Sequence, residues 1–136
     1  MNRVTPSVTA LSAPWFDACA RGELLLQHCG VCDVFQFYPR SICAQCGEAD
    51  PRWVQASGQG HVMSFTIVQR ALSKAYDAPY VVALIKLKEG PTMMSNITGA
   101  ADGELQIGLA VTAHFEAWNE DIHLPVFCIS KEEPAE

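Results

Sequence analysis

The sequence lacks a long hydrophobic run, and no segment approaches the roughly 20 apolar residues that cross a bilayer. Its first residues also lack the apolar centre and small-residue cleavage pattern of a secretory signal. We therefore expect a soluble protein in the cytoplasm, where thiols stay reduced. Because of that compartment, the six cysteines do not predict a disulfide framework.

Catalytic signatures are missing as well. The chain offers no nucleophile–base pair, no paired carboxylates in one motif and no glycine-rich phosphate loop. Cations are few, since 9 Lys and Arg stand against 15 Asp and Glu. We therefore expect a protein that is not an enzyme by itself and does not bind nucleic acid.

Two Cys-x2-Cys pairs are the strongest pattern present. Their members are Cys29, Cys32, Cys43 and Cys46. Two tight knuckles supply four thiolates in the tetrahedral arrangement that Zn²⁺ accepts, and Gly30 and Gly47 suit the turns. Four thiolates leave no position for water, so the predicted zinc is structural. Iron of the rubredoxin type and a redox-active dithiol pair are the rival interpretations.

The remaining pattern predicts one short helix followed by strands. Apolar residues at helical spacing after Pro14, with Ser12 as a cap and Gly22 as a stop, predict the helix. Short strands flank the cysteine pairs, and the glycine-containing segment 57–60 predicts a flexible hinge. Beyond it, alternation of apolar and polar residues predicts strands at 61–69, 80–88, 92–98, 110–117 and 124–130.

These elements predict a mainly β protein with two modules. Five short strands and one weak helical stretch at 71–76 favour a small closed barrel, of which the OB-fold is the usual version, although a sandwich also fits. We predict a helical segment at 1–22, a zinc ribbon at 23–57, an OB-fold at 58–130 and an acidic surface tail at 131–136. The ribbon is too small to fold alone, so metal should hold it together.

Other candidate residues have weaker signals. Arg40, Arg70 and Lys74 are candidate phosphate contacts because they lie near the predicted module junction, with solvated surface cations as the alternative. Four aromatic residues are candidate partner contacts: Trp15, Phe16, Phe37 and Tyr38. Packing in the core of the ribbon is the alternative for Phe37, as it is for the neighbouring Phe35. Cys19 and Cys128 are expected to be buried thiols, and a catalytic thiol at either is the alternative.

Several motifs together resemble one family. They are Leu24-Leu-Leu-Gln-His-Cys-x-x-Cys, Phe37-Tyr-Pro-Arg40, Cys-x-x-Cys-Gly, Ser57-Gly-Gln-Gly60 and Ala78-Pro-Tyr-Val-Val-Ala-Leu. The chain resembles OB-fold proteins with an N-terminal rubredoxin-like zinc ribbon that are associated with acyl-CoA enzymes, and the likeness covers nearly its whole length. It departs at Ala44, where the family often has proline, but all four metal ligands remain.

This resemblance implies a non-catalytic accessory subunit in a hetero-oligomer with a thiolase-like acyltransferase or condensing enzyme. The ribbon and the N-terminal helix would dock on the partner, and the barrel would help to shape a channel for the pantetheine arm of an acyl-CoA. Other members accompany steroid side-chain aldolases or hydratases, which is the first alternative. A nucleic-acid-binding OB-fold is the alternative from another class, and the net charge of −6 opposes it.

Overall fold

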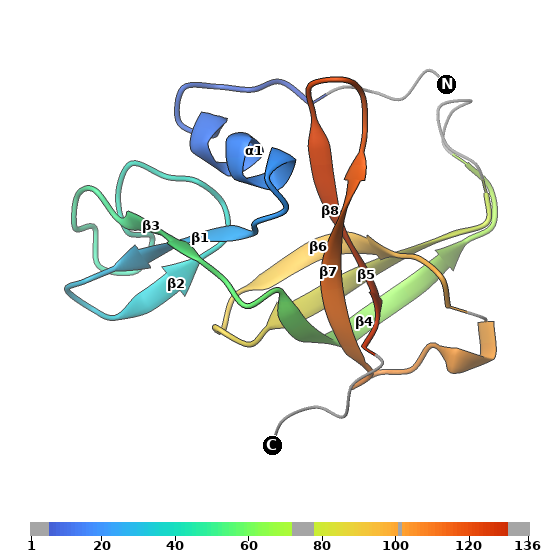
Figure 1. Cartoon of the computed structure of the whole chain (residues 1–136). Helices are drawn as coiled ribbons and strands as arrows, with labels where there is room; N and C mark the ends of the chain where they lie inside the picture. Colours follow the sequence, from blue (N-terminus) through green and yellow to red (C-terminus); the bar gives the residue numbers. More distant parts are fainter. Residues whose placement is uncertain (1–5, 72–77, 101, 131–136) are drawn as a thin grey trace.

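A computed structural model describes residues 6–71, 78–100 and 102–130, whose strands form two sheets (Figure 1). The ribbon sheet is antiparallel and has the order β2-β1-β3. Its strands are β1 (Leu25–Cys29), β2 (Val34–Gln36) and β3 (Arg52–Gln55). The other strands close a barrel in the order β4-β5-β6-β8-β7. They are β4 (Gln59–Val68), β5 (Tyr80–Leu87), β6 (Thr92–Ile97), β7 (Ala110–Ala117) and β8 (His123–Ile129).

The five barrel strands confirm the fold class predicted from the sequence, a small OB-type barrel that follows a cysteine ribbon. The predicted limits of the barrel strands agree with the observed ones to within two residues. The reason is that apolar and polar residues alternate clearly along a strand with one buried face. A 3-10 helix, η1 (Asp102–Glu104), precedes β7. Most of the predicted helical stretch 71–76 and the predicted tail 131–136 lie outside the described residues.

Helix α1 (Ala13–Ala20) lies between the ribbon and the barrel and packs against β1, β7 and β8 (Figure 1). It buries Trp15, Ala18 and Cys19. Ser12 occupies the N-cap position as predicted, but its hydroxyl oxygen accepts a hydrogen bond from the N–H of Thr9 at 2.9 Å instead of capping the helix. Among the described residues no helix is long and apolar enough to span a membrane.

The segment between the two sheets is held firmly, which contradicts the flexible hinge expected at 57–60. On the ribbon side, the N–H of Ala56 donates to the carbonyl oxygen of Leu24 at 2.8 Å. On the barrel side, the N–H of Ser57 donates to Oε2 of Glu89 at 2.8 Å, and the carbonyl oxygen of Gly58 accepts from Ala113 at 2.8 Å. These bonds join the segment to both modules, so its glycines serve close packing and turn geometry.

One hydrophobic core runs through both modules. The same cluster of buried side chains contains Trp15 of α1, Leu26 of β1, and Val62, Ile85 and Phe127 of the barrel. Leu26, Val62, Ile85 and Phe127 are at most 1% exposed. Ribbon, helix and barrel therefore share apolar burial, which is the main stabilising term for a chain of this size.

Substitution at Gly60 tests the close approach between β4 and β5. A Cβ at this position would lie 2.6 Å from the backbone oxygen of Lys86 and 2.9 Å from Cγ2 of Ile85. We expect Gly60→Ala to lower the free energy of unfolding by about 2 kcal/mol because the strands must move apart. Chemical denaturation measures the loss, and Gly103→Ala, where a Cβ meets nothing within 4 Å, is the control. Equal stability of the two variants would contradict the close contact.

Candidate metal centre

The four paired cysteines lie in two knuckles at one end of the ribbon sheet. Cys29 is the last residue of β1, and Cys32 lies in the turn that leads to β2. Cys43 and Cys46 lie in the long loop between β2 and β3. In both knuckles an N–H turns back to a cysteine carbonyl at 2.9 Å, from Asp33 to Cys29 and from Gly47 to Cys43.

The residue after each pair adopts a left-handed backbone conformation. Gly47 has φ +80° and Asp33 has φ +59°. Glycine adopts this conformation without steric cost, and aspartate does so more readily than most residues. Gly47 therefore does what the sequence predicted of it, whereas Asp33, rather than Gly30, is the left-handed residue of the first knuckle.

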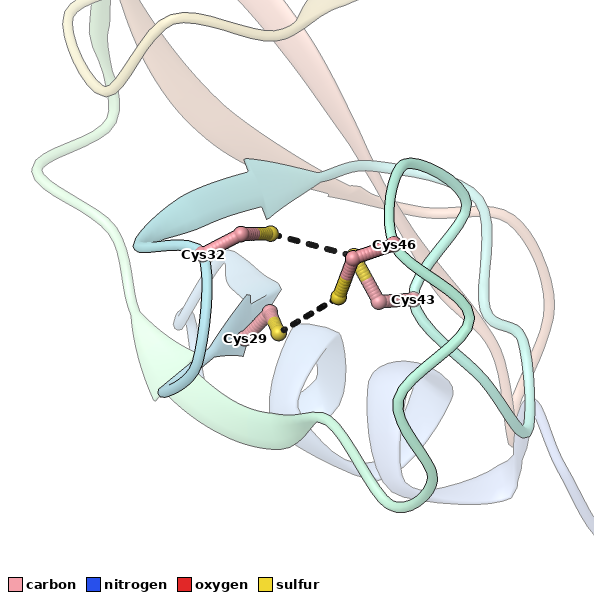
Figure 2. Close-up of side chains that lie close together, drawn as sticks. All are labelled: Cys29, Cys32, Cys43 and Cys46. Atoms are coloured by element: carbon pink, nitrogen blue, oxygen red, sulfur yellow. Dashed lines mark hydrogen bonds between the residues drawn. The ribbon is translucent and has the colours of Figure 1, made fainter.

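The sulfur atoms of the four cysteines converge on one point (Figure 2). All four Sγ atoms lie within 4.8 Å of one another. The Sγ atoms of Cys29 and Cys46 are 3.6 Å apart, as are those of Cys32 and Cys43. Tetrahedral Zn²⁺ with bonds of about 2.3 Å requires sulfur–sulfur distances of about 3.8 Å. The donor set therefore fits a structural zinc ion, which would link the two knuckles.

Backbone groups prepare the second knuckle for a thiolate. The N–H groups of Cys46 and Gln45 point to the sulfur of Cys43 and lower its pKa to about 6. Burial and the neighbouring thiols instead raise the pKa of Cys32 to about 12. Such close sulfurs cannot all be charged unless a cation lies among them. Bound zinc supplies this charge and holds all four as thiolates.

Two glutamines hold the loop that carries the second knuckle. Gln27 of β1 is only 2% exposed and pairs directly with Gln36 of β2. Its Oε1 accepts from Nε2 of Gln36 at 2.7 Å and from the N–H of Arg40 at 2.9 Å, and its Nε2 donates to the Arg40 carbonyl at 2.9 Å. Gln36 in turn accepts the N–H of Ala44 at 2.9 Å, next to Cys43. These glutamines were missed in the sequence because their partners are distant along the chain.

His28 lies beside Cys29 but belongs to the strand and not to the metal group. Its Nε2 lies 2.7 Å from Oδ1 of Asp33, and its ring packs on Phe35 with centroids 4.7 Å apart. The set of converging ligand atoms contains the four cysteines alone among the described residues. His28 therefore helps to fix the first knuckle through Asp33, the residue with positive φ.

The four aromatic candidates form one cluster, although they come from two distant segments. Trp15 makes edge contacts with Phe16 and Phe37, with centroids 5.0 and 5.9 Å apart. Phe37 in turn makes an edge contact with Tyr38, with ring centroids 5.1 Å apart. Trp15 is 9% exposed and belongs to the core, whereas Tyr38 is 62% exposed. The cluster therefore leads from the core to an open aromatic ring on the ribbon surface.

Two of the three cationic candidates lie among the described residues, in different loops. Arg40 is exposed in the loop after β2, where Gln27 holds its backbone. Arg70 is exposed just after β4. Lys74 lies outside the described residues. A role in phosphate binding for these three residues stays a prediction.

The two remaining cysteines are placed apart from the metal group. Cys19 is fully buried in α1, and this burial raises the pKa of its thiol to about 12. Cys128 lies in β8, where its Sγ is 3.6 Å from the carbonyl oxygen of Thr112. The expected burial is found at Cys19, whose raised pKa makes its thiol a poor nucleophile at neutral pH, whereas Cys128 is only half-buried.

Known proteins share both modules. Residues 16–52 match the ChsH2 rubredoxin-like zinc ribbon domain, and residues 53–116 match the ChsH2 C-terminal OB-fold domain. A DUF35 domain-containing scaffold protein of Pyrococcus furiosus is 35% identical over 107 residues, which cover 76% of this chain and 71% of that protein. The solved Ltp2-ChsH2(DUF35) aldolase contains a chain with TM-score 0.83 and 32% identity, covering 92% of this chain and 98% of that one.

A longer relative contains the same region as one part. A probable enoyl-CoA hydratase alpha subunit of Thermomonospora curvata is 33% identical over 125 residues, or 92% of this chain. The chain spans only 39% of that subunit's length. The shared region is therefore also used as a module within larger proteins.

Metal analysis tests the cysteine site. We expect plasma emission to find one zinc ion per chain, bound by the four converging sulfurs. Cys43→Ser should lose the metal and unfold the ribbon, because the knuckles are otherwise held by few apolar contacts. Cys128→Ser, which removes a thiol outside the group, should retain it. A folded wild-type protein without metal, or with iron, would disprove the zinc assignment.

Substitution of Gln27 tests the glutamine pair. Gln27→Leu removes the acceptor of the Arg40 N–H and one of the two acceptors of Nε2 of Gln36, so we expect zinc affinity to fall about 10- to 100-fold. Competition with a chromogenic chelator measures the change. Gln27→Glu keeps the accepting oxygen and should lose less affinity, and the exposed Gln55→Leu is the matched control. Unchanged affinity in Gln27→Leu would show that the knuckles need no such support.

Proposed function

Because the chain belongs to the DUF35 family, with a ChsH2-type zinc ribbon and OB-fold, we propose that it is a non-catalytic accessory subunit of an enzyme complex. The observation that carries this proposal is the closed metal site. Four sulfurs occupy all the positions of a tetrahedral zinc ion, so no place remains for substrate or activated water. The metal then serves to shape a surface, and the chemistry belongs to a partner subunit.

The remaining reactive groups support the same role. Cys19 is a buried residue of α1 whose thiol has a raised pKa, and Cys128 lies within a strand of the barrel. Nε2 of His114 in β7 lies 3.4 Å from Oγ1 of Thr98 and 3.7 Å from Oε2 of Glu116, whereas the thiol of Cys128 in the neighbouring β8 contacts the carbonyl oxygen of Thr112. Among the described residues these groups do not form the nucleophile–base arrangement that covalent catalysis requires.

We place the partner on the aromatic cluster of Trp15, Phe16, Phe37 and Tyr38. Trp15 anchors the cluster in the core, and Tyr38 extends it to the surface. Rigid aromatic residues of this kind supply much of the binding free energy at protein interfaces. Gln27 holds the backbone of Arg40, two residues after Tyr38, and so helps to fix the segment that carries the exposed end of the cluster.

The partner in this proposal acts on an acyl-CoA. A thiolase-like acyltransferase or condensing enzyme is the first candidate, with the barrel lining the path of the pantetheine arm and Arg40, Arg70 and Lys74 contacting its phosphates. An aldolase or hydratase is the second candidate, favoured by the names of the Ltp2-ChsH2(DUF35) aldolase and the probable enoyl-CoA hydratase alpha subunit. A hetero-oligomer in the cytoplasm is expected in either case.

Affinity capture tests the accessory role. We expect the tagged chain, purified from its native cell extract at moderate salt, to retain an enzyme that acts on CoA thioesters. Tyr38→Ala should weaken this complex by about 2 kcal/mol, or about 30-fold, because it removes the exposed end of the aromatic cluster. Titration of the identified partner measures the loss, and Ile107→Ala, at an equally open apolar residue, is the control. Recovery of the chain alone or with RNA would refute the proposal.

A further inference from the structure

The outer face of β4, β5 and β6 carries apolar side chains that the core does not use. Along β5 the side chains of Val81, Ala83 and Ile85 point into the barrel and are at most 9% exposed. Leu84, between them, points outward and is 38% exposed. In β6 the neighbours Met93 and Met94 are 2% and 60% exposed. The strand alternation thus places Leu84 and Met94 on the outer face.

A third apolar side chain joins them through a β-bulge. Leu84 and Met94 are directly paired across β5 and β6. On the other side of β5, the β4 register shifts between Val62 and Ser64, which leaves Met63 as an extra residue that is 43% exposed. The sulfur of Met63 accepts a hydrogen bond from the hydroxyl of Thr92 in β6 at 3.2 Å, so the side chain of Met63 reaches across β5. Met63, Leu84 and Met94 form the outer methionine face.

The one charged residue of β4, β5 and β6 is a cation, Lys86. His61 and Lys86 are exposed partners on β4 and β5, and Lys86 also pairs with Thr92. None of the residues of β4, β5 and β6 is Asp or Glu. This differs from the chain as a whole, in which 15 acidic residues exceed 9 basic ones. The face therefore combines an apolar centre with a positive border.

We propose that the outer methionine face docks a segment of a partner protein whose apolar side chains are bordered by carboxylates. Methionine is flexible and polarisable and adapts to apolar side chains of varied shape. Complementary charge at Lys86 would orient the segment. The strands concerned are those on which OB-folds commonly bind their ligands. The proposed docking rests on the accessory role proposed above, since it adds a second contact to the same assembly.

Other occupants fit these side chains less well. Single-stranded nucleic acid stacks its bases on aromatic rings, whereas Met63, Leu84 and Met94 offer none at the centre of the face. A second copy of this chain would present the same cationic border and no carboxylate from these strands. A partner surface with acidic residues around an apolar centre satisfies both features.

Methionine oxidation provides the test. Dilute hydrogen peroxide oxidises exposed methionines faster than buried ones, so in the free chain Met63 and Met94 should react much faster than Met93. We expect oxidation of Met63 and Met94 to slow about tenfold or more in the complex isolated through a tag on this chain. Mass spectrometry of the peptides measures the rates, and Met93 is the internal control in both samples.

Each other outcome overturns the docking face. If Met63 and Met94 oxidise as fast in an intact complex with a CoA enzyme as in the free chain, the docking face is refuted. The accessory role would still stand. Recovery of the chain without a partner would refute both. Protection that increases with concentration of the purified chain would assign the face to a second copy, and protection by a thymidine oligonucleotide would assign it to nucleic acid.

A charged variant gives an independent readout. Met94→Lys adds a cation to the positive border and removes an apolar contact, so we expect the fraction of captured partner to fall about tenfold or more. Ile107→Lys introduces the same charge at an exposed apolar residue outside these strands and is the matched control. Circular dichroism and zinc content show whether both variants fold. Equal partner capture by the two folded variants would contradict the proposal.

Discussion

The fold depends on four sulfur atoms that lie within 4.8 Å of one another. Sulfurs at this distance repel one another as thiolates, and only a cation makes their close approach favourable. The ribbon sheet has three short strands, with few side chains to bury on its own. A zinc ion therefore supplies what the small core of the ribbon cannot, and it fixes the loop between β2 and β3 against the end of β1.

The effect of the metal extends beyond the knuckles through buried polar groups. Gln36 holds the N–H of Ala44 beside Cys43, and Gln27 holds Gln36 together with the backbone of Arg40. The loop that bears Phe37 and Tyr38 lies between these anchored points. A buried amide with unpaired atoms is costly, so the network favours a single arrangement of the loop. The zinc site and the aromatic cluster are in this way parts of one rigid surface.

The sequence predicted the features that depend on local pattern. The Cys-x2-Cys pairs and the alternation in the barrel strands each have a fixed spacing, and the structure follows both. Features that depend on partners distant along the chain were not predictable. The side chain of Gln27 bonds to Gln36 and to the backbone of Arg40. The hydrogen bond from the N–H of Ser57 to Glu89 spans 32 residues. The expected hinge was wrong for this reason, because small residues indicate a flexible backbone only when nothing else holds it.

The bulge at Met63 affects both the course of β4 and the side chains on the outer face of the barrel. A regular β4 would continue the alternation and turn the side chain after Val62 to a fixed face, with a partner in the β5 ladder. The extra residue breaks one ladder position, while Val62 stays buried opposite Ile85 and Ser64 stays paired with Leu84. Met63 lies on the outer face, where its sulfur accepts a hydrogen bond from Thr92. Bulges that redirect a side chain are typical of functional surfaces. The bulge also bends β4, which pairs with both β5 and β7 to close the barrel, so one irregularity serves the fold as well as the outer face.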